Sequence, residues 1–305
     1  INLFMKKILV TGSTGLVGKY LQKILPEANF VSSKDYNLLI QQDVQKMFKE
    51  LNPEIVIHLA ARVGGVHHNI IEPVKYFEEN ILMNTLIINE SYKNNTQKFL
   101  GLLSSCIYPD NIDSYPIKEN CLFLGAPHED LFSYSYSKRC MAIQIDAYRK
   151  KYKSNFSYLI PCNLYGEFDK FDEVQGHFVG ALINKILVAK KNNHKSITLF
   201  GDGTPLRQFM HAKDLALIIK EVVSNDIKEN FNVGNIENLS ILQIAKLALK
   251  VCEAENLEIE FDKTKPNGQL RKDIDLSLMK SLLPKFKPTS LKEGIKEVYE
   301  KIGTK

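Results

Sequence analysis

Residues 6–25 read KKILVTGSTGLVGKYLQKIL and decide the fold. The apolar run at 8–10 is typical of a short buried strand, and the apolar side chains that follow the turn recur at helical spacing. Gly12, Gly15 and Gly18 stand between the two patterns. Such a glycine turn lets a pyrophosphate approach the backbone, where the N-terminus of the helix faces its negative charge. The stretch therefore predicts a dinucleotide-binding unit rather than a purely structural turn.

The chain after this unit alternates short apolar runs with helical patterns. Strands that are apolar throughout and alternate with helices indicate a mostly parallel sheet covered on both faces. The predicted fold class is α/β, with a doubly wound, Rossmann-like sheet. We expect strands at 28–31, 55–59, 98–103, 157–160 and 197–200, and helices at 41–51, 76–93 and 134–153.

The pattern becomes less regular after residue 165. We therefore divide the chain into a dinucleotide-binding domain at 5–165 and a smaller C-terminal α/β domain at 166–305, mainly for the substrate, with some segments returning to the first sheet. Residues 1–4 are too few for the apolar region of a signal peptide, so the protein is expected to start at Met5. In the second domain we expect helices at 177–190, 213–223, 240–252, with Ser240 as N-cap, and 291–302, and a strand at 230–233.

The composition limits the classes of protein. With 305 residues, 44% hydrophobic and 25% charged, the chain is typical of globular proteins and unlike disordered, collagen-like or coiled-coil chains. No apolar run approaches the roughly 18 to 20 residues of a membrane span. The net charge of +5 suits an anionic small molecule but is no nucleic-acid footprint unless it clusters. Five cysteines without Cys-x-x-Cys spacing favour the reducing cytoplasm, and the scattered histidines predict no metal site.

The end of the second expected strand distinguishes the two nicotinamide dinucleotides. An acid there would hold the ribose 2′-hydroxyl, whereas a base favours a 2′-phosphate. The segment Ser32-Ser33-Lys34-Asp35 has its serines and lysine before its acid, which favours NADPH over NADH. Asp43 is a candidate for contacting the adenine, although an acid at a helix start also stabilises the helix without a ligand.

Tyr134 and Lys138 open an expected helix at Tyr-x-x-x-Lys spacing, which places both side chains on one helix face. A lysine ammonium beside a phenol favours the phenolate, so the tyrosine exchanges a proton nearer neutral pH than its free pKa of about 10 allows. The spacing alone is common, but Ser104 and Ser105 follow a mid-chain strand. With the glycine turn, this set resembles the extended short-chain dehydrogenase/reductase superfamily. The resemblance makes Ser104, Tyr134 and Lys138 its catalytic serine, tyrosine and lysine.

Further segments are similar to the GDP-L-fucose synthase family over nearly the whole chain, from Met5 through the RKDID of 271–275. That family epimerises GDP-4-keto-6-deoxymannose and then reduces it. The resemblance implies an NADPH-dependent enzyme that binds a GDP-sugar and is usually a homodimer. The matching segments are GSTGLVG (12–18), LAARVGGV (59–66), LLSSCIYP (102–109), NLYG (163–166), GHFVGALI (176–183) and GDGTPLRQFMHAKDLA (201–216).

Cys106 and His177 match the cysteine and histidine that the family uses for epimerisation. A ketone at C4 of a hexose acidifies the hydrogens on C3 and C5, so an acid/base pair on opposite sides of the ring inverts both centres before the ketone is reduced. Each residue has another interpretation. A cysteine after a strand is commonly a buried apolar residue, and a histidine that opens a helix can cap it.

The resemblance also implies binding residues, of which Arg207 is the strongest for the diphosphate because a guanidinium donates two hydrogen bonds at once. Lys185 stands where the family often has arginine, Phe200 where it can have tryptophan, and Gly180 where it has proline, which leaves the accepted sugar open. The expected cofactor residues are Gly12, Thr14, Gly15, Leu16, Val17, Ser33, Lys34, Asp43, Leu59, Ala60, Ala61, Tyr134, Lys138, Pro161, Asn163, Leu164 and His177. The expected substrate residues are Ser105, Asn163, Lys185, Phe200, Arg207 and Arg271.

Three alternatives stay open. The nearest is a reductase-only relative acting on a GDP-4-keto-6-deoxy-heptose. The second is an NAD-retaining nucleotide-sugar epimerase or dehydratase, although dehydratases carry an acid soon after the serine, where this chain has Cys106-Ile107-Tyr108. The third is a non-catalytic dinucleotide sensor, which the intact catalytic set disfavours. We expect no membrane or nucleic-acid partner, and a homodimer joined through the helices at 76–93 and 134–153.

Overall fold

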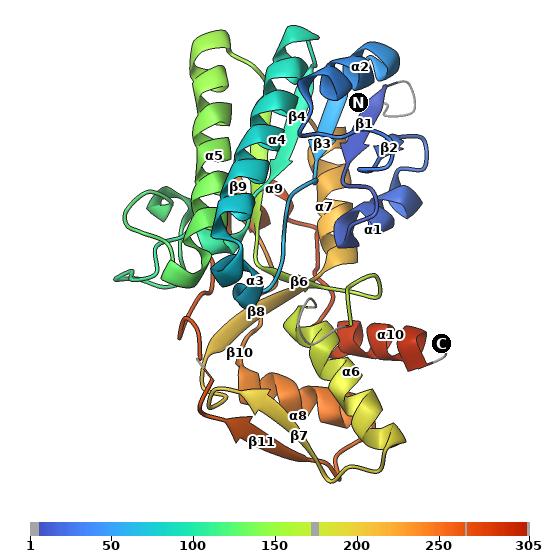
Figure 1. The fold of residues 1–305 in the computed structure, drawn as a ribbon, viewed down its shortest axis with the longest axis vertical. Coiled ribbons are helices and arrows are strands. Elements are labelled where there is room, and N and C mark those ends of the chain that lie inside the picture. The colour runs from blue at the N-terminus through green and yellow to red at the C-terminus, as the bar shows by residue number, and fades with distance from the viewer. Residues whose placement is uncertain (1–5, 172–176, 266, 304–305) are drawn as a thin grey trace.

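The computed structural model describes residues 6–171, 177–265 and 267–303, so the expected start at Met5 lies outside the described residues. The chain forms a larger and a smaller lobe (Figure 1). The larger lobe contains a six-stranded parallel sheet in the order β2-β1-β3-β4-β5-β9. Its strands are β1 (Ile8–Thr11), β2 (Asn29–Val31), β3 (Ile55–His58), β4 (Lys98–Leu102), β5 (Phe156–Pro161) and β9 (Phe231–Val233).

Three of the inner strands of this sheet are buried along their whole length, as their continuous apolar sequences predict. Every residue of β1, β3 and β5 is buried, which requires cover on both faces. From β1 the chain passes outward to β2 and then returns to the other side of β1 as β3. A ligand crevice is expected outside the carboxyl ends of the strands where the order reverses in this way.

Helices cover both faces of the sheet, which confirms the predicted doubly wound α/β class (Figure 1). On one face α4 (Pro73–Lys93) packs along α5 (Phe132–Tyr152) and against α2 (Gln41–Leu51). On the other face α1 (Leu16–Ile24) packs against α7 (Ala212–Ser224).

The smaller lobe has its own hydrophobic core, formed mainly by three helices packed on two short sheets. Ser240 is the N-cap of α8, as predicted, and its hydroxyl accepts a hydrogen bond from Gln243 N in a capping box. The helices of this lobe are α6 (Phe178–Lys191), α8 (Ile241–Val251) and α10 (Leu291–Gly303), and its strands are β6 (Asn163–Tyr165), β8 (Leu206–His211) and β10 (Asn238–Ser240) in one sheet, and β7 (Ser196–Phe200) and β11 (Glu258–Asp262) in the other.

The chain passes between the lobes more than once. β5 runs almost directly into β6, and β8 leads into α7, which returns to the larger lobe before β9 joins its sheet. A boundary at residue 165 stays a prediction. Within the described ranges, none of the helices has the length and apolar character that crossing a membrane requires. The remaining elements are α3 (Val66–Ile71), α9 (Ser277–Leu282) and the 3₁₀ turns Ser105–Ile107, Glu119–Cys121 and Glu129–Leu131.

Candidate active site

A cavity of about 1440 Å³ lies where the carboxyl ends of β1, β3, β4 and β5 face the smaller lobe. Both lobes contribute to its wall, so neither lobe forms the site alone. Most of the predicted cofactor residues line it. They are Gly12, Thr14, Gly15, Leu16, Val17, Ser33, Leu59, Ala60, Ala61, Tyr134, Pro161, Asn163, Leu164 and His177.

The glycine turn has the shape that a pyrophosphate requires. Gly12 has a φ of +76°, and a Cβ there would lie 2.7 Å from the backbone nitrogen of Ala60. A Cβ on Gly18 would lie 2.7 Å from the Ser13 carbonyl oxygen, so α1 packs closely under the turn. Gly15 precedes α1 without a side-chain cap, and the first N–H groups of α1 have no side-chain partner there. These residues fit a dinucleotide.

The segment after β2 presents hydroxyl groups to the cavity. Ser32 and Ser33 line it, whereas the Asp35 carboxylate accepts hydrogen bonds of 2.8 Å from both the nitrogen and the hydroxyl of Ser32. These hydrogen bonds lower the pKa of Asp35 and engage the carboxylate inside the turn. A carboxylate held in this way is withdrawn from a ribose hydroxyl, which agrees with the predicted preference for NADPH.

Three predicted cofactor residues, Lys34, Asp43 and Lys138, are not among the described residues that line the cavity. Asp43 accepts a hydrogen bond of 3.0 Å from Asn37 N. It therefore fixes a loop whose residues 37–39 do line the cavity, and a contact of Asp43 itself with the adenine stays a prediction.

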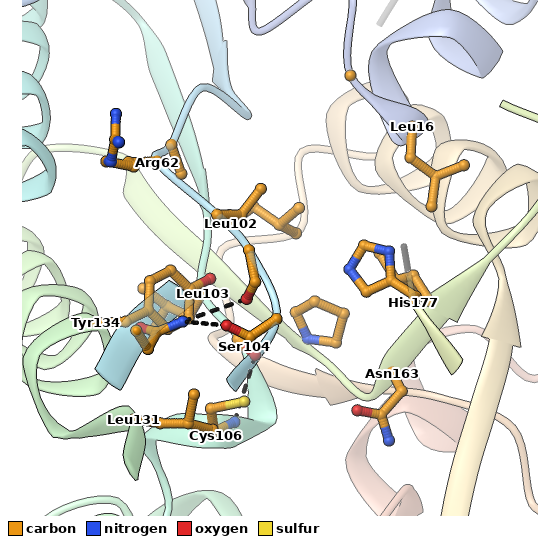
Figure 2. A pocket seen from close by; sticks show the side chains of 18 of the residues that line it. Leu16, Arg62, Leu102, Leu103, Ser104, Cys106, Leu131, Tyr134, Asn163 and His177 are labelled. Carbon is orange, nitrogen blue, oxygen red and sulfur yellow. Dashed lines mark hydrogen bonds between the residues drawn. The ribbon is translucent and has the colours of Figure 1, made fainter. Parts of the chain in front are cut away.

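Ser104, Tyr134 and Cys106 lie together on one side of the cavity, and His177 and Asn163 lie on the other (Figure 2). Ser104 follows β4, and its hydroxyl accepts a hydrogen bond of 3.3 Å from Cys106 N. This bond starts the 3₁₀ turn Ser105–Ile107. Tyr134 comes from the first turn of α5.

Lys138 lies behind Tyr134 rather than in the cavity wall. Its Nζ is 6.0 Å from the centre of the Tyr134 ring and donates a hydrogen bond of 2.9 Å to the Leu102 carbonyl oxygen. Burial lowers the pKa of Lys138 to about 8. Burial also raises the pKa of Tyr134, and its hydrogen bond with Ser104 only partly opposes this effect. The expected lowering of the tyrosine pKa by Lys138 is therefore corrected: Tyr134 is a protonated phenol, ready to donate a proton.

The Cys106 thiol faces a lysine that the sequence reasoning missed. Lys272 Nζ donates to Cys106 Sγ at 2.9 Å. Burial alone would raise the pKa of Cys106, but Lys272, Ser104 and Arg207 together hold it below its ordinary value. The sequence does contain a signal for this residue: in the segment RKDID (271–275) the prediction selected Arg271 but not the adjacent Lys272.

His177 is paired with an acid that the sequence reasoning did not select. His177 Nδ1 lies 2.8 Å from Asp169 Oδ1, and the Asp169 side chain is only 3% exposed. Burial lowers the pKa of His177, but Asp169 outweighs this effect and the pKa is raised. Gly180 lies beside this pair, since a Cβ there would be 3.4 Å from Asp169 Oδ2.

The predicted substrate residues divide into two groups. Asn163, Phe200 and Arg207 line the cavity. Ser105, Lys185 and Arg271 are not among the described lining residues: Ser105 is buried, Lys185 donates to the Thr198 carbonyl oxygen at 2.9 Å, and Arg271 pairs with Asp273. The sequence did not show that Lys185 and Arg271 have these hydrogen-bond and ion-pair partners nearby. The structure adds Lys265, Asn267, Gly268, Gln269 and Lys272 to the same wall.

We expect Asp169→Asn to lower the pKa of His177. The carboxylate stabilises the imidazolium, and an opposite charge at this distance shifts a pKa by about 1 to 3 units. The midpoint of the His177 titration, followed by NMR, should therefore move toward acidic pH by about one unit or more. His194 gives an internal control, since it lies beyond the C-terminus of α6. An unchanged His177 midpoint would show that Asp169 does not hold its proton.

On this fold, a glycine turn at the switch point together with Ser104, Tyr134 and Lys138 defines a dinucleotide-dependent oxidoreductase or epimerase of the short-chain type. The model of the NAD dependent epimerase/dehydratase family matches residues 8–234, and the chain belongs to that family.

Proteins similar to this chain carry more specific names than the family model does. GDP-L-fucose synthase of Dictyostelium discoideum is 35% identical over 96% of this chain and 93% of its own. GDP-L-colitose synthase of Yersinia pseudotuberculosis is 36% identical over 90% of each chain. The described resemblance to the GDP-L-fucose synthase family is thereby confirmed.

Solved structures of similar proteins include two kinds of GDP-sugar enzyme. A GDP-L-fucose synthetase from Naegleria fowleri bound to NADP has a TM-score of 0.88 at 30% identity, and the match covers 98% of this chain and 94% of that one. A GDP-D-glycero-L-gluco-heptose synthase from Campylobacter jejuni has a TM-score of 0.89 at 26% identity, covering 98% and 99%.

Proposed function

We propose that this chain converts GDP-4-keto-6-deoxymannose by epimerisation at C3 and C5 followed by NADPH-dependent reduction at C4. One observation carries the proposal. Cys106 and His177 face one cavity from opposite sides, beside Ser104 and Tyr134 (Figure 2). Their pKa values are displaced in opposite directions, that of the thiol down and that of the imidazole up. A base and an acid are thus ready on two sides of one ring.

The epimerisation uses these two side chains. The Cys106 thiolate removes a proton from the carbon beside the ketone, and the electron pair of the C–H bond moves into the enolate. His177, whose imidazolium form Asp169 stabilises, returns a proton to the opposite face of that carbon. The exchange inverts the centre without a change in oxidation state.

The reduction uses the other wall residues. When bound, NADPH supplies the hydride for the C4 carbonyl carbon. Ser104 hydrogen-bonds the carbonyl oxygen and orients it. Tyr134 donates its phenolic proton to that oxygen as negative charge develops there, and its raised pKa keeps the phenol protonated until then. Lys138 supports Tyr134 from behind, with its Nζ 6.0 Å from the centre of the Tyr134 ring.

The GDP group fits the part of the cavity that the smaller lobe forms. Arg207 provides a planar cation for the diphosphate. Phe200, which is 61% exposed, offers an aromatic face for the base, and Lys185 and Lys265 lie 5.6 and 6.0 Å from its ring centre. An aromatic ring that stacks on a base and has cations nearby favours an anionic nucleotide as the ligand.

A homodimer joined through α4 and α5 is part of this proposal. The two helices pack along each other and expose apolar side chains to solvent, which a second copy of the pair would cover. Five free cysteines support the cytoplasm as the compartment. The exposed apolar side chains are Val74, Phe77, Leu82 and Tyr92 on α4, and Phe132, Tyr136, Ile143 and Tyr152 on α5.

The second candidate is a reductase that acts only on a GDP-4-keto-6-deoxy-heptose. The similarity to the Campylobacter jejuni heptose synthase favours it.

An incubation in heavy water with NADPH tests the proposal. We expect the product of GDP-4-keto-6-deoxymannose to carry deuterium at C3 and C5 with both centres inverted, because each epimerisation passes through solvent exchange. The heptose counterpart should be turned over more slowly. Reduction without deuterium would leave a reductase alone, and faster turnover of the heptose would favour the second candidate.

A further inference from the structure

Lys272 lies beside Cys106 in the cavity wall, and the described residues give it no acidic partner. Its side chain reaches the cavity wall, although the residue is only 9% exposed. Within the described ranges its hydrogen bond is the one to Cys106 Sγ, and no carboxylate lies within ion-pair distance of its Nζ. The nearest acid along the chain, Asp273, is held by both Arg271 Nε and Arg271 Nη2.

The backbone around Lys272 is fixed from two sides. The next residues form a bridge with Ile117, in which Ile117 N donates to Asp273 O at 2.9 Å and Asp275 N donates to Ile117 O at 2.8 Å. Ile274 N also donates to Gln208 Oε1 of β8 at 2.9 Å. An anchored backbone limits the positions that the Lys272 ammonium can take relative to Cys106.

We infer that Lys272 is a positioning residue for the epimerisation base, whose ammonium keeps the Cys106 sulfur ionised and in place before substrate arrives. This inference deepens the proposed function and rests on it for the role of Cys106. A buried ammonium within hydrogen-bond distance stabilises a thiolate, as cations do at other reactive cysteines. When Cys106 takes the proton from carbon, an S–H bond forms, and Lys272 keeps its own protons.

The other charged groups around Cys106 do not replace Lys272. Arg207 acts on the thiol through its charge, and Ser104 contributes a hydrogen bond from a neutral group. Tyr134 lies on the same side of the cavity as the sulfur and His177 lies across from it (Figure 2), and the pKa values of both respond to the charge of Cys106. Removing Lys272 therefore removes the direct cationic partner, while the others remain.

The test measures Cys106 in the substrate-free full-length protein. Its rate of alkylation by iodoacetamide, read by peptide mass, follows the thiolate fraction from pH 5 upward. In the unmodified protein we expect the Cys106 midpoint to lie below that of Cys140, an exposed cysteine whose pKa burial raises. In Lys272→Met the Cys106 midpoint should rise by about 1 to 3 pH units, whereas the Cys140 midpoint should not change.

Two further variants distinguish an effect on the ionisation of Cys106 from a general effect on the structure. Lys272→Arg keeps the cation, so its Cys106 midpoint should stay close to that of the unmodified protein. Lys265→Met removes a different cation from the same cavity wall and should leave the Cys106 midpoint where it was. An unmoved midpoint in Lys272→Met, or a Cys106 midpoint above that of Cys140 in the unmodified protein, would overturn the inference.

Activity then distinguishes this inference from the proposed function. In Lys272→Met the acid side of the deuterium-exchange profile should move to higher pH with the Cys106 midpoint, while reduction of a substrate that needs no epimerisation keeps its profile. A higher KM in both reactions with an unmoved midpoint would make Lys272 a substrate contact and refute its role on Cys106. A moved midpoint in a protein that exchanges no deuterium would refute the proposed epimerisation alone.

Discussion

Replacing Tyr134 by phenylalanine should reduce the rate of NADPH-dependent reduction by roughly 10²- to 10⁴-fold, because the C4 oxygen loses its positioned proton donor. The hydroxyl is the only atom removed, and the ring remains against Lys138. Stopped-flow absorbance of NADPH measures the loss directly. Deuterium exchange at C3 and C5 should persist, since Cys106 and His177 are unchanged.

Tyr136→Phe is a matched control for this prediction. Tyr136 lies two residues further along α5, is 39% exposed and lies over Arg139 rather than in the described cavity wall. It should retain the full reduction rate. Near-normal reduction by Tyr134→Phe would remove Tyr134 from the role of proton donor and turn attention to water or to Ser104.

Replacing Cys106 by serine should reduce deuterium exchange by roughly 10²- to 10⁴-fold, since a hydroxyl beside Lys272 cannot provide the anion that a thiol provides. Direct reduction of a keto-sugar that needs no epimerisation should continue, because Ser104 and Tyr134 remain. Mass spectrometry of the product, with and without NADPH, measures the two steps separately.

Cys140→Ser is the control for the loss of a cysteine. Cys140 is an exposed residue of α5 and does not line the described cavity. It should exchange deuterium at the normal rate. If Cys106→Ser exchanges as fast as Cys140→Ser, the base of the epimerisation is another group.

The sequence was sufficient for the parts of this protein that depend on short-range patterns. The helix expected at 41–51 is α2, and that expected at 291–302 is α10 with one more residue at its end. Periodic apolar positions and capping chemistry are local, so they can be read from neighbours in the chain. The glycine turn is equally local, since a positive φ or a missing Cβ is needed wherever its backbone is placed.

The candidate site was only partly readable from the sequence, and the reason is again physical. Arg207 and Phe200 were identified by their motif and do line the cavity. Lys185 and Arg271 were chosen for their charge, but their hydrogen bonds go to Thr198 O and to Asp273. A sequence shows which side chains carry charge, but not which partner each one meets.

Sequence alone determined the α/β class, the dinucleotide turn, the Ser104, Tyr134 and Lys138 set and the resemblance to a family, because each rests on spacing or on residue type. Tertiary structure decided the ionisation of the site. Lys272 and Cys106 are 166 residues apart along the chain, yet they meet at 2.9 Å. Burial and such distant partners set a pKa through distance and desolvation, and both quantities exist only once the chain has folded.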